Sequence, residues 1–395
     1  MATTWSLESF SRAGLLVACA VLIFAAVVIP GMAQTQAATT TTFTVLYSFD
    51  GASGEFPLAA LIVDSSGNLY GTTSEGGAHG GGTVFKVTAS GEETVLHSFK
   101  GGKSDGKFPI AGLVRDKAGN LCGTTNLGGV AGYGTVFKVE ENGDETLLHS
   151  FGESEKDGRY PSAGLVSDDK GNLYGTTQEG GDHGYGTIFK LDADGKETVL
   201  HSFAGNPTDG QYSIAGLVRD AEGNLYGTTE LGGTFNDGTV FKLDTVGKES
   251  ILFSFTGMAS GAYPFGGVIL DSKGNLYGTT AYGANNDGVV FKLDALGRET
   301  VLYIFGGTDG SFPSAGLVRD AKGNLYGTTE FGGTDGPGTV FRVSTSGKET
   351  VLHSFDGTDG ADILNGLVRD TDGNLYGTAT EGGAHGQGTV FKLSQ

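Results

Sequence analysis

The chain has 395 residues and a formal net charge of −20 at pH 7, and it contains 71 glycines but only 8 prolines. Such an acidic surface excludes nucleic acid and anionic lipid as natural partners and repels uronic-acid polymers, whereas it favours cations and basic partners. Of the two cysteines, only Cys122 lies beyond the N-terminal segment described next, so we expect no internal disulfide in the mature chain.

The first 33 residues have the three-part layout of a secretory signal peptide. Arg12 precedes an apolar run over residues 14–28, and Gly31 and Ala33 offer the small residues at positions −3 and −1 that signal peptidase requires. We therefore expect a secreted or cell-surface protein, with periplasmic residence as an alternative.

Two features follow from this N-terminal layout. The apolar stretch over residues 13–30 is about 18 residues long, so an uncleaved membrane anchor is the alternative to cleavage. Residues 34–42 form a Thr-rich leader that we expect to be disordered. Beyond it the repeats described below run to Gln395, so we expect a monomer without a transmembrane domain once the signal is removed.

A segment reading Gly-Asn-Leu-Tyr-Gly-Thr-Thr, with small variations, occurs seven times. Successive copies are spaced by 52, 52, 52, 51, 49 and 50 residues. A period near fifty residues indicates a repeat architecture. The fourth residue of the segment falls at Tyr70, Cys122, Tyr174, Tyr226, Tyr277, Tyr326 and Tyr376.

Each repeat predicts four short strands. In the copy that starts at Ala163, apolar runs cover residues 163–168, 172–177, 187–192 and 197–203. Gly-containing hairpin signals join the first run to the second and the third to the fourth, and a Gly-rich stretch lies between the second and third. Four short antiparallel strands per repeat are typical of a β-propeller blade. Their apolar residues occupy both strand faces, as expected of a blade packed between two neighbours.

The two ends of the repeat region predict how the ring closes. Residues 43–49 form an orphan fourth strand, and the chain stops after a third strand at 388–393. Seven sets of strands one to three therefore meet seven fourth strands only if the N-terminal strand completes the last blade, which also hides exposed strand edges. We predict a single all-β domain over residues 43–395, a seven-bladed β-propeller of four-stranded blades with a 3+1 closure.

The repeat also resembles a known family. The run Ala-Gly-Leu-Val-Arg-Asp-x-x-Gly-Asn-Leu-Tyr-Gly-Thr-Thr-Glu-x-Gly-Gly, followed by Gly-Thr-Val-Phe-Lys-Leu and Val-Leu-His-Ser-Phe, is similar to the GloVer (Gloeobacter and Verrucomicrobia) tandem repeat of exported bacterial proteins. The resemblance covers about residues 43 to 395 and implies an extracellular or cell-surface repeat protein without a defined activity. Kelch repeats have a similar period, but they use a Trp in each blade that this chain lacks.

Two loop families are expected on one face of the propeller, around the mouth of its channel. The first precedes strand one and reads Asp-Gly-x-Phe/Tyr-Pro in three repeats, from Asp105, Asp157 and Asp309. Asp209 and Asp359 keep the acid without the proline, and Ser53 and Ser260 replace it. We interpret the Asp as a turn cap that bonds its own backbone, with calcium bound across several loops as the alternative.

The second loop family follows strand two and differs between blades. Blades one, three and seven carry Glu75 with His79, Glu179 with His183 and Glu381 with His385. The Glu position holds Leu127, Leu231, Tyr282 and Phe331 in the other four blades. We therefore expect the two Glu/His pairs of blades seven and one to lie side by side, and blades four to six to present an apolar arc.

The remaining histidines, His97, His149, His201 and His353, share a column with Tyr47, Phe253 and Tyr303. Since this column accepts phenylalanine, we interpret these histidines as packing residues. Four arginines end the innermost strands beside an Asp, and we expect them to form ion pairs or hydrogen bonds near the hairpin face, with anion binding as the alternative. These arginines are Arg115, Arg219, Arg319 and Arg369.

Near-equal repeats favour a binding or surface-interaction module over an enzyme, because catalysis requires one privileged constellation. We hypothesise a secreted non-enzymatic propeller whose candidate binding residues are the Glu/His pairs and the arc of Leu231, Tyr282 and Phe331. Its partner would be an extracellular glycan or a protein. One alternative is a metal-assisted lyase or hydrolase acting on an extracellular glycan, with a divalent cation as cofactor and Glu75, His79, Glu381 and His385 as ligands or acid/base groups. A purely structural envelope protein is the other alternative.

Overall fold

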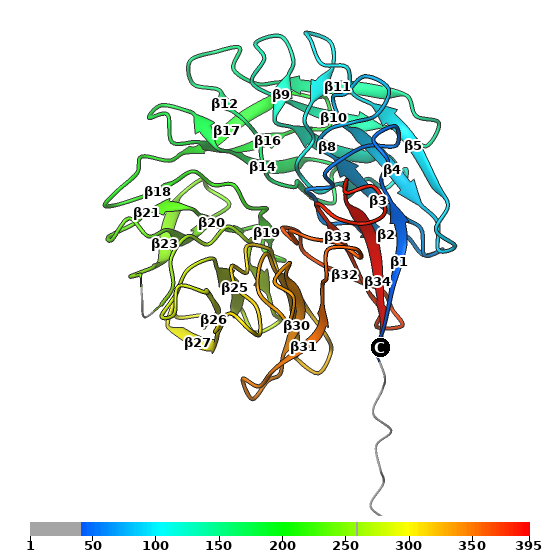
Figure 1. Cartoon of the computed structure of the whole chain (residues 1–395). Helices are drawn as coiled ribbons and strands as arrows, with labels where there is room; N and C mark the ends of the chain where they lie inside the picture. Colours follow the sequence, from blue (N-terminus) through cyan, green and yellow to red (C-terminus); the bar gives the residue numbers. More distant parts are fainter. Residues whose placement is uncertain (1–40, 258–259) are drawn as a thin grey trace, which may run out of the picture. The chain divides into compact units, whose positions relative to one another are not determined.

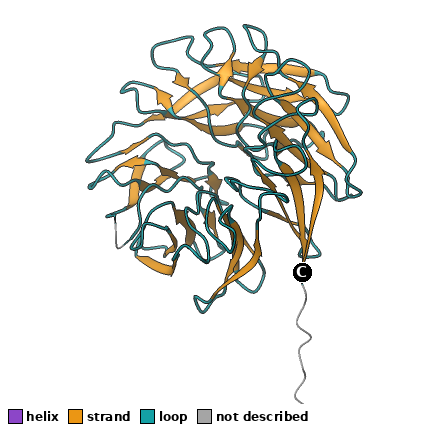
Figure 2. Ribbon diagram, in the orientation of Figure 1, coloured by secondary structure: helices purple, strands orange, loops and turns teal. Residues whose placement is uncertain are grey.

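The computed structural model of the protein describes residues 41–257 and 260–395, and Figure 1 shows its cartoon. These residues form strands and turns without any α-helix, as Figure 2 shows. Seven antiparallel sheets of four strands each are the blades of a β-propeller. The predicted all-β, seven-bladed fold is therefore confirmed.

The blades follow one another along the chain. Blade 1 contains β2 (Ile62–Val63), β3 (Leu69–Thr73), β4 (Thr83–Val87) and β5 (Glu93–Ser98). Blade 2 contains β7 (Val114–Arg115), β8 (Leu121–Thr125), β10 (Thr135–Val139) and β11 (Glu145–Ser150). Blade 3 contains β13 (Val166–Ser167), β14 (Leu173–Thr177), β16 (Thr187–Leu191) and β17 (Glu197–Ser202). Blade 4 contains β19 (Val218–Arg219), β20 (Leu225–Thr229), β22 (Thr239–Leu243) and β23 (Glu249–Ser254).

The last three blades have the same plan. Blade 5 contains β24 (Ile269–Leu270), β25 (Leu276–Thr280), β26 (Val289–Leu293) and β27 (Glu299–Ile304). Blade 6 contains β28 (Val318–Arg319), β29 (Leu325–Thr329), β30 (Thr339–Val343) and β31 (Glu349–Ser354). Blade 7 contains β32 (Val368–Arg369), β33 (Leu375–Ala379), β34 (Thr389–Ser394) and β1 (Thr42–Ser48).

The N-terminal strand closes the ring. Strand β1 pairs antiparallel with β34, from Thr42 opposite Ser394 to Ser48 opposite Thr389. In Figure 1 the blue β1 accordingly lies beside the red β34. The predicted 3+1 closure is confirmed, and β1 begins one residue earlier than the sequence pattern indicated.

The predicted signal peptide, the alternative membrane anchor and leader residues 34–40 lie outside the described residues. Among the residues that are described, no helix is long and apolar enough to cross a membrane.

Phenylalanine holds neighbouring blades together. Phe99, which follows the outer strand of blade 1, meets Phe137 of blade 2 edge-to-face with ring centroids 5.0 Å apart, and both rings are fully buried. Equivalent pairs recur at the other six interfaces: Phe49 with Phe85, Phe151 with Phe189, Phe203 with Phe241, Phe255 with Phe291, Phe305 with Phe341 and Phe355 with Phe391. Each such aromatic pair adds about 0.5–1.5 kcal/mol beyond the burial of its area, so the core consists of seven similar interfaces between blades.

The repeated Gly-Thr-Thr segment of the second strand connects each blade to the next. A Cβ atom on Gly71 would come within 2.7 Å of Phe85 and 2.8 Å of Leu61, so only glycine fits. The hydroxyl of Thr72 donates a hydrogen bond to the carbonyl of Ala111 in the next blade, at 3.2 Å. The same bond recurs around the ring from Thr124, Thr176, Thr228, Thr279, Thr328 and Thr378.

Candidate ligand-binding face

The two loop families pair with each other above every blade. In blades 2, 3 and 4 they form two-stranded ribbons: β6 (Gly106–Lys107) with β9 (Leu127–Gly128), β12 (Gly158–Arg159) with β15 (Glu179–Gly180), and β18 (Gly210–Gln211) with β21 (Leu231–Gly232). In the other blades single bridges join Glu55 to Glu75, Ala262 to Tyr282, Ser311 to Phe331 and Ala361 to Glu381. The column that varies between glutamate and apolar residues therefore occupies one equivalent position in all seven blades.

The Glu/His pairs of blades 1, 3 and 7 are solvent-exposed. All six side chains, Glu75, His79, Glu179, His183, Glu381 and His385, belong to exposed residues. Groups of three His, Cys, Asp or Glu side chains whose ligand atoms lie within 4.8 Å of one another occur among the described residues, but none contains any of these six. The pairs thus form an exposed polar sector, and they are not gathered into a metal-binding triad.

One of the exposed histidines lies beside a groove. His183 lines a groove of about 420 Å³ together with Lys156, Asp182 and His201. Lys156 Nζ and Asp182 Oδ1 lie 3.2 Å apart across it. This ion pair is exposed, so it contributes little to stability.

The apolar arc contains a continuous row of aromatic rings. Tyr282 and Phe331 are 37% and 41% exposed, whereas Leu231 is half-buried. Phe312 lies between the first two, with ring centroids 4.7 Å from Tyr282 and 5.7 Å from Phe331, both edge-to-face. Tyr263 extends the row, 5.4 Å from Tyr282. We call Tyr263, Tyr282, Phe312 and Phe331 the aromatic row.

Two members of this row occupy a strained backbone position that recurs in every blade. Tyr263 and Phe312 have φ angles of 55° and 57°, in the left-handed region. The backbone N–H of Phe312 donates to Asp287 O in the loop of the preceding blade, and its carbonyl accepts from Glu330 N in its own blade. The residue thus connects two neighbouring loops. The equivalent residues in the other blades are Phe56, Phe108, Tyr160, Tyr212 and Asp362, with φ between 52° and 58°.

The channel itself is narrow and uncharged. The cavity on its axis has a volume of about 150 Å³ and is lined by three residues from each blade. These are residues 58–60, 110–112, 162–164, 214–216, 265–267, 314–316 and 364–366, and none of them is ionisable. Ligand pockets usually enclose about 300–1,000 Å³, so the axis has room for a few water molecules at most and ligand contact falls to the surrounding loops.

The Asp of the first loop family caps its turn, as predicted. Asp105 accepts hydrogen bonds from the backbone N–H groups of Lys100 at 2.9 Å and Gly106 at 2.7 Å. Burial opposes the charged form, but these bonds and the nearby His97 hold the pKa of Asp105 below its usual value.

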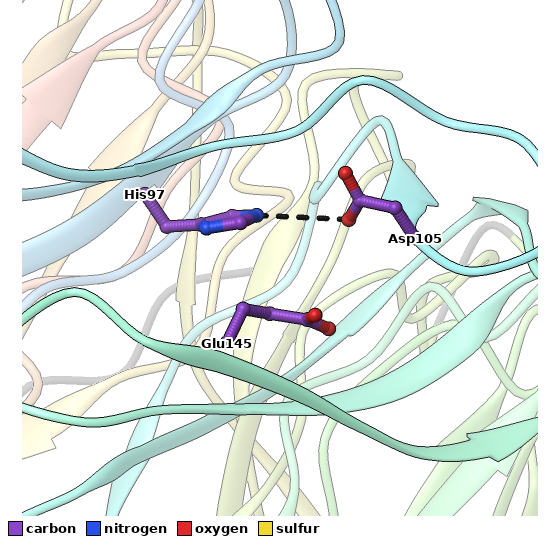
Figure 3. A group of neighbouring side chains, drawn as sticks. All are labelled: His97, Asp105 and Glu145. Carbon is purple, nitrogen blue, oxygen red and sulfur yellow. Dashed lines mark ion pairs between the residues drawn. The ribbon is translucent and has the colours of Figure 1, made fainter.

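The four histidines interpreted as packing residues have a second role that was not predicted. The His97 ring does pack edge-to-face on Phe99, at 4.7 Å. Its Nε2, however, faces Asp105 Oδ1 at 3.6 Å, and Glu145 of the next blade lies beside both, as Figure 3 shows. His149 faces Asp157 at 3.6 Å, His201 faces Asp209 at 3.0 Å and His353 faces Asp359 at 2.7 Å. The interpretation as packing residues alone was therefore wrong.

The repeats themselves contained the signal for these pairs. Where the histidine column holds Phe253, the Asp of the following connection is Ser260. Where it holds Tyr303, the acid is kept as Asp309, and the tyrosine hydroxyl donates to it. A comparison of the two columns blade by blade, rather than of the histidine column alone, would have revealed the pairing.

The glutamates at these interfaces are unusually easy to protonate. Burial raises the pKa of Glu299 to about 7, and Glu93, Glu197, Glu249 and Glu349 have pKa values of about 7 for the same principal reason. The seventh position in this column is Phe43, which stacks on His353 with ring centroids 3.6 Å apart.

On the face that carries the short hairpins, an arginine contacts the preceding blade. Arg115 lies over the Tyr70 ring of the preceding blade, and its Nη1 is 3.7 Å from Asp64 Oδ2 there. The predicted ion pair is thus present at this arginine, with the acid of the neighbouring blade as partner.

Between blades 2 and 3, where Cys122 replaces the tyrosine and Ser167 the arginine, a cavity of about 490 Å³ opens. Burial raises the pKa of the Cys122 thiol to about 11, so it is not a reactive thiolate.

Two solved lyase structures share this fold at low sequence identity. A streptogramin B lyase superposes with a TM-score of 0.59 and 14% identity over 90% of this chain and 97% of its own. Virginiamycin B lyase from Staphylococcus aureus gives 0.60 and 13% identity over 90% and 99%. A gluconolactonase from Xanthomonas campestris gives 0.45 and 15% identity over 79% and 89%. At these identities the likeness to the two lyases concerns the fold alone.

A search of curated proteins finds no significant match. The Gloeobacter/Verrucomicrobia repeat, by contrast, matches residues 31–237 and 213–395. The two matches together span the whole propeller, including the strands, loops and interfaces described above. The chain therefore belongs to the Gloeobacter/Verrucomicrobia repeat family.

Proposed function

We propose that the protein is an exported, non-enzymatic binding module that attaches to an uncharged extracellular polysaccharide through the aromatic row. The observation that carries this proposal is the set of four edge-to-face rings across blades 5 and 6, two of which are more than a third exposed. Aromatic side chains offer flat apolar surfaces with little conformational entropy to lose, and pyranose rings have apolar faces that pack against them.

The strained backbone supports a role for the side chains. A non-glycine residue in the left-handed region costs on the order of 1 kcal/mol, and glycine or asparagine would adopt this conformation with less strain. Six of the seven equivalent residues are nonetheless Phe or Tyr, while Asp362 shows that the backbone conformation does not itself require an aromatic ring. The choice of residue therefore points to the ring, through packing or through contact with a ligand.

Charge and shape support the class of partner. The net charge of −20 disfavours anionic polymers, and the 150 Å³ axial cavity offers no ionisable side chain for acid/base chemistry. An exposed row on the loop face suits an extended ligand that lies across several blades.

The test is a binding assay with the purified mature chain. Pull-down on insoluble cellulose, chitin and mannan, and affinity electrophoresis with soluble glucans, are compared for the wild type and for Leu231→Ala/Tyr282→Ala/Phe331→Ala. Loss of two aromatic contacts weakens binding by about tenfold or more, because each is worth on the order of 1 kcal/mol.

Leu127→Ala is the matched control, since it removes an apolar side chain from the same column in blade 2. Polysaccharide binding by the triple variant that equals that of the wild type would disprove the proposal, as would retention of a protein partner in place of any polysaccharide.

A further inference from the structure

Three consecutive blade interfaces each bring together a histidine, an aspartate and a glutamate. The histidine comes from the outer strand of one blade, the aspartate from the connection that follows, and the glutamate from the first residue of the outer strand in the next blade. In each group one ligand atom per residue lies within 4.8 Å of the others. The groups are His97, Asp105 and Glu145; His149, Asp157 and Glu197; and His201, Asp209 and Glu249.

In the first two groups, polar atoms are buried without a hydrogen-bond partner. His149 Nε2, Asp157 Oδ1 and Glu197 Oε1 all lack one, although the Asp157 side chain is only 6% exposed. His97 Nε2 and Glu145 Oε1 are also buried without a hydrogen-bond partner. Buried polar atoms are normally satisfied, so a histidine Nε2 that lacks a partner and faces two carboxylates indicates a missing ligand.

The spacing within these two groups suits a metal ion better than a hydrogen bond. His97 Nε2 lies 3.6 Å from Asp105 Oδ1, and His149 Nε2 lies 3.6 Å from Asp157 Oδ2. Both distances are too long for a hydrogen bond. Two ligands of a tetrahedral zinc ion, each bound at roughly 2.0–2.2 Å, lie about 3.3–3.6 Å apart. The separation of the two side chains therefore matches the edge of a zinc coordination shell.

At the other interfaces the histidine position is satisfied or replaced, whereas the glutamate Oε1 still lacks a partner at Glu93, Glu249, Glu299 and Glu349. His201 and Asp209 are hydrogen-bonded to each other at 3.0 Å. His353 bonds Asp359 at 2.7 Å and stacks on Phe43, which replaces the glutamate. At the interface of blades 4 and 5 the positions hold Phe253 and Ser260. Buried histidine Nε2 atoms without a hydrogen-bond partner are thus confined, among the described residues, to His97 and His149.

We propose that the interfaces between blades 1 and 2 and between blades 2 and 3 each bind one zinc ion through these His, Asp and Glu side chains. One imidazole nitrogen and two carboxylates form a borderline donor set that zinc accepts, and water completes the four ligands. The histidine side chains are 18% exposed, which leaves a path for the ion and its water. Each ion connects the outer strands of two neighbouring blades and stabilises the ring at its rim.

The test is a count of bound ions in the full mature chain. The protein is stripped with chelator and dialysed against zinc, and bound metal is measured by mass spectrometry with isothermal titration as a second readout. Wild type is expected to bind two equivalents and to melt at a higher temperature with zinc. His97→Phe/Asp105→Ser, which copies the natural Phe253/Ser260 interface, is expected to bind one. Conversion of His149 and Asp157 in the same way removes the second.

Two controls keep the result interpretable. His79→Ala/His183→Ala removes exposed histidines outside both groups and is expected to keep two equivalents. If a converted interface does not fold, Glu145→Gln/Glu197→Gln keeps the packing and is expected to weaken zinc binding at least tenfold. Absence of saturable zinc binding by the wild type would overturn the proposal. Converted variants that bind as many ions as the histidine control would overturn it as well.

Discussion

Replacing Cys122 by tyrosine tests how the repeat holds neighbouring blades together. In six blades the tyrosine hydroxyl donates to the hairpin aspartate at 3.0–3.2 Å. In blade 2, Asp116 has no such donor, and the place of the ring belongs to the 490 Å³ cavity between blades 2 and 3. Ser167, which replaces an arginine there, leaves room for the ring.

The expected gain follows from the contacts of the other blades. Tyr70 and Tyr376 are each 6% exposed, so a tyrosine at 122 becomes largely buried, and burying a large apolar side chain contributes about 1.5–3 kcal/mol. The hydrogen bond to Asp116 adds about 0.5–1.5 kcal/mol. The buried thiol already supplies part of the first contribution, and fixing the new side chain costs about 1 kcal/mol. Cys122→Tyr is therefore expected to stabilise the protein by about 1–2 kcal/mol.

Denaturant unfolding followed by circular dichroism measures this gain. For about 350 ordered residues, 1 kcal/mol corresponds to a rise of about 1.3 °C in Tm, so thermal scans serve as a second readout. Cys122→Phe is the control that fills the cavity without the hydroxyl, and it is expected to gain about 1 kcal/mol less than tyrosine. A lower Tm for Cys122→Tyr than for wild type would contradict the expected stabilisation and would show that this interface has adapted to the smaller residue.

Two further predictions concern the interfaces. Glu299→Gln tests the buried carboxyl whose pKa of about 7 exceeds the ordinary value of 4.5. Because the folded state keeps a proton that the unfolded state releases, the wild type loses stability as pH rises from about 4.5 to 7. The full loss is about 3.4 kcal/mol, reduced to about 1–2 by partial exposure, so Glu299→Gln should be the more stable protein at pH 8 and equal to wild type near pH 4. A pH-independent difference in urea midpoint would contradict this. Thr378→Val removes the 3.2 Å bond to Ala59 O that joins blade 7 to blade 1 and the 2.8 Å bond that the Thr378 hydroxyl accepts from Asn365 Nδ2, and it should cost about 1–3 kcal/mol. Thr124→Val, at an ordinary interface, removes only the bond to Ala163 O and should cost about 0.5–1.5 kcal/mol, whereas no loss in either variant would contradict the role of this threonine in joining neighbouring blades.

The fold was predictable because the same strand pattern recurs seven times along the chain. The period gave the number of blades, and the unmatched strand at 43–49 gave the closure that β1 and β34 display. Gly71 and its equivalents could be assigned to the core, but the reason only glycine fits, the Phe85 ring of the same blade, becomes visible only in the folded blade.

The site was less predictable because it depends on contacts between different repeats. The exposed positions of Tyr282 and Phe331 agree with a candidate arc, but Phe312 belongs to the other loop family, and only the fold places it between them. The histidine column misled because each column was considered alone. The polar neighbours of His97 are Asp105 of the next connection and Glu145 of the next blade, which lie 8 and 48 residues further along the chain.

Isothermal titration with soluble glucan and chitin oligosaccharides measures whether the aromatic row binds an uncharged polysaccharide. The wild type and Leu127→Ala should bind one of these ligands with equal affinity, while Tyr282→Ala/Phe331→Ala should bind it about tenfold or more weakly with unchanged Tm. Equal affinity for all three proteins, or no binding of any uncharged oligosaccharide by the wild type, would disprove binding through the aromatic row.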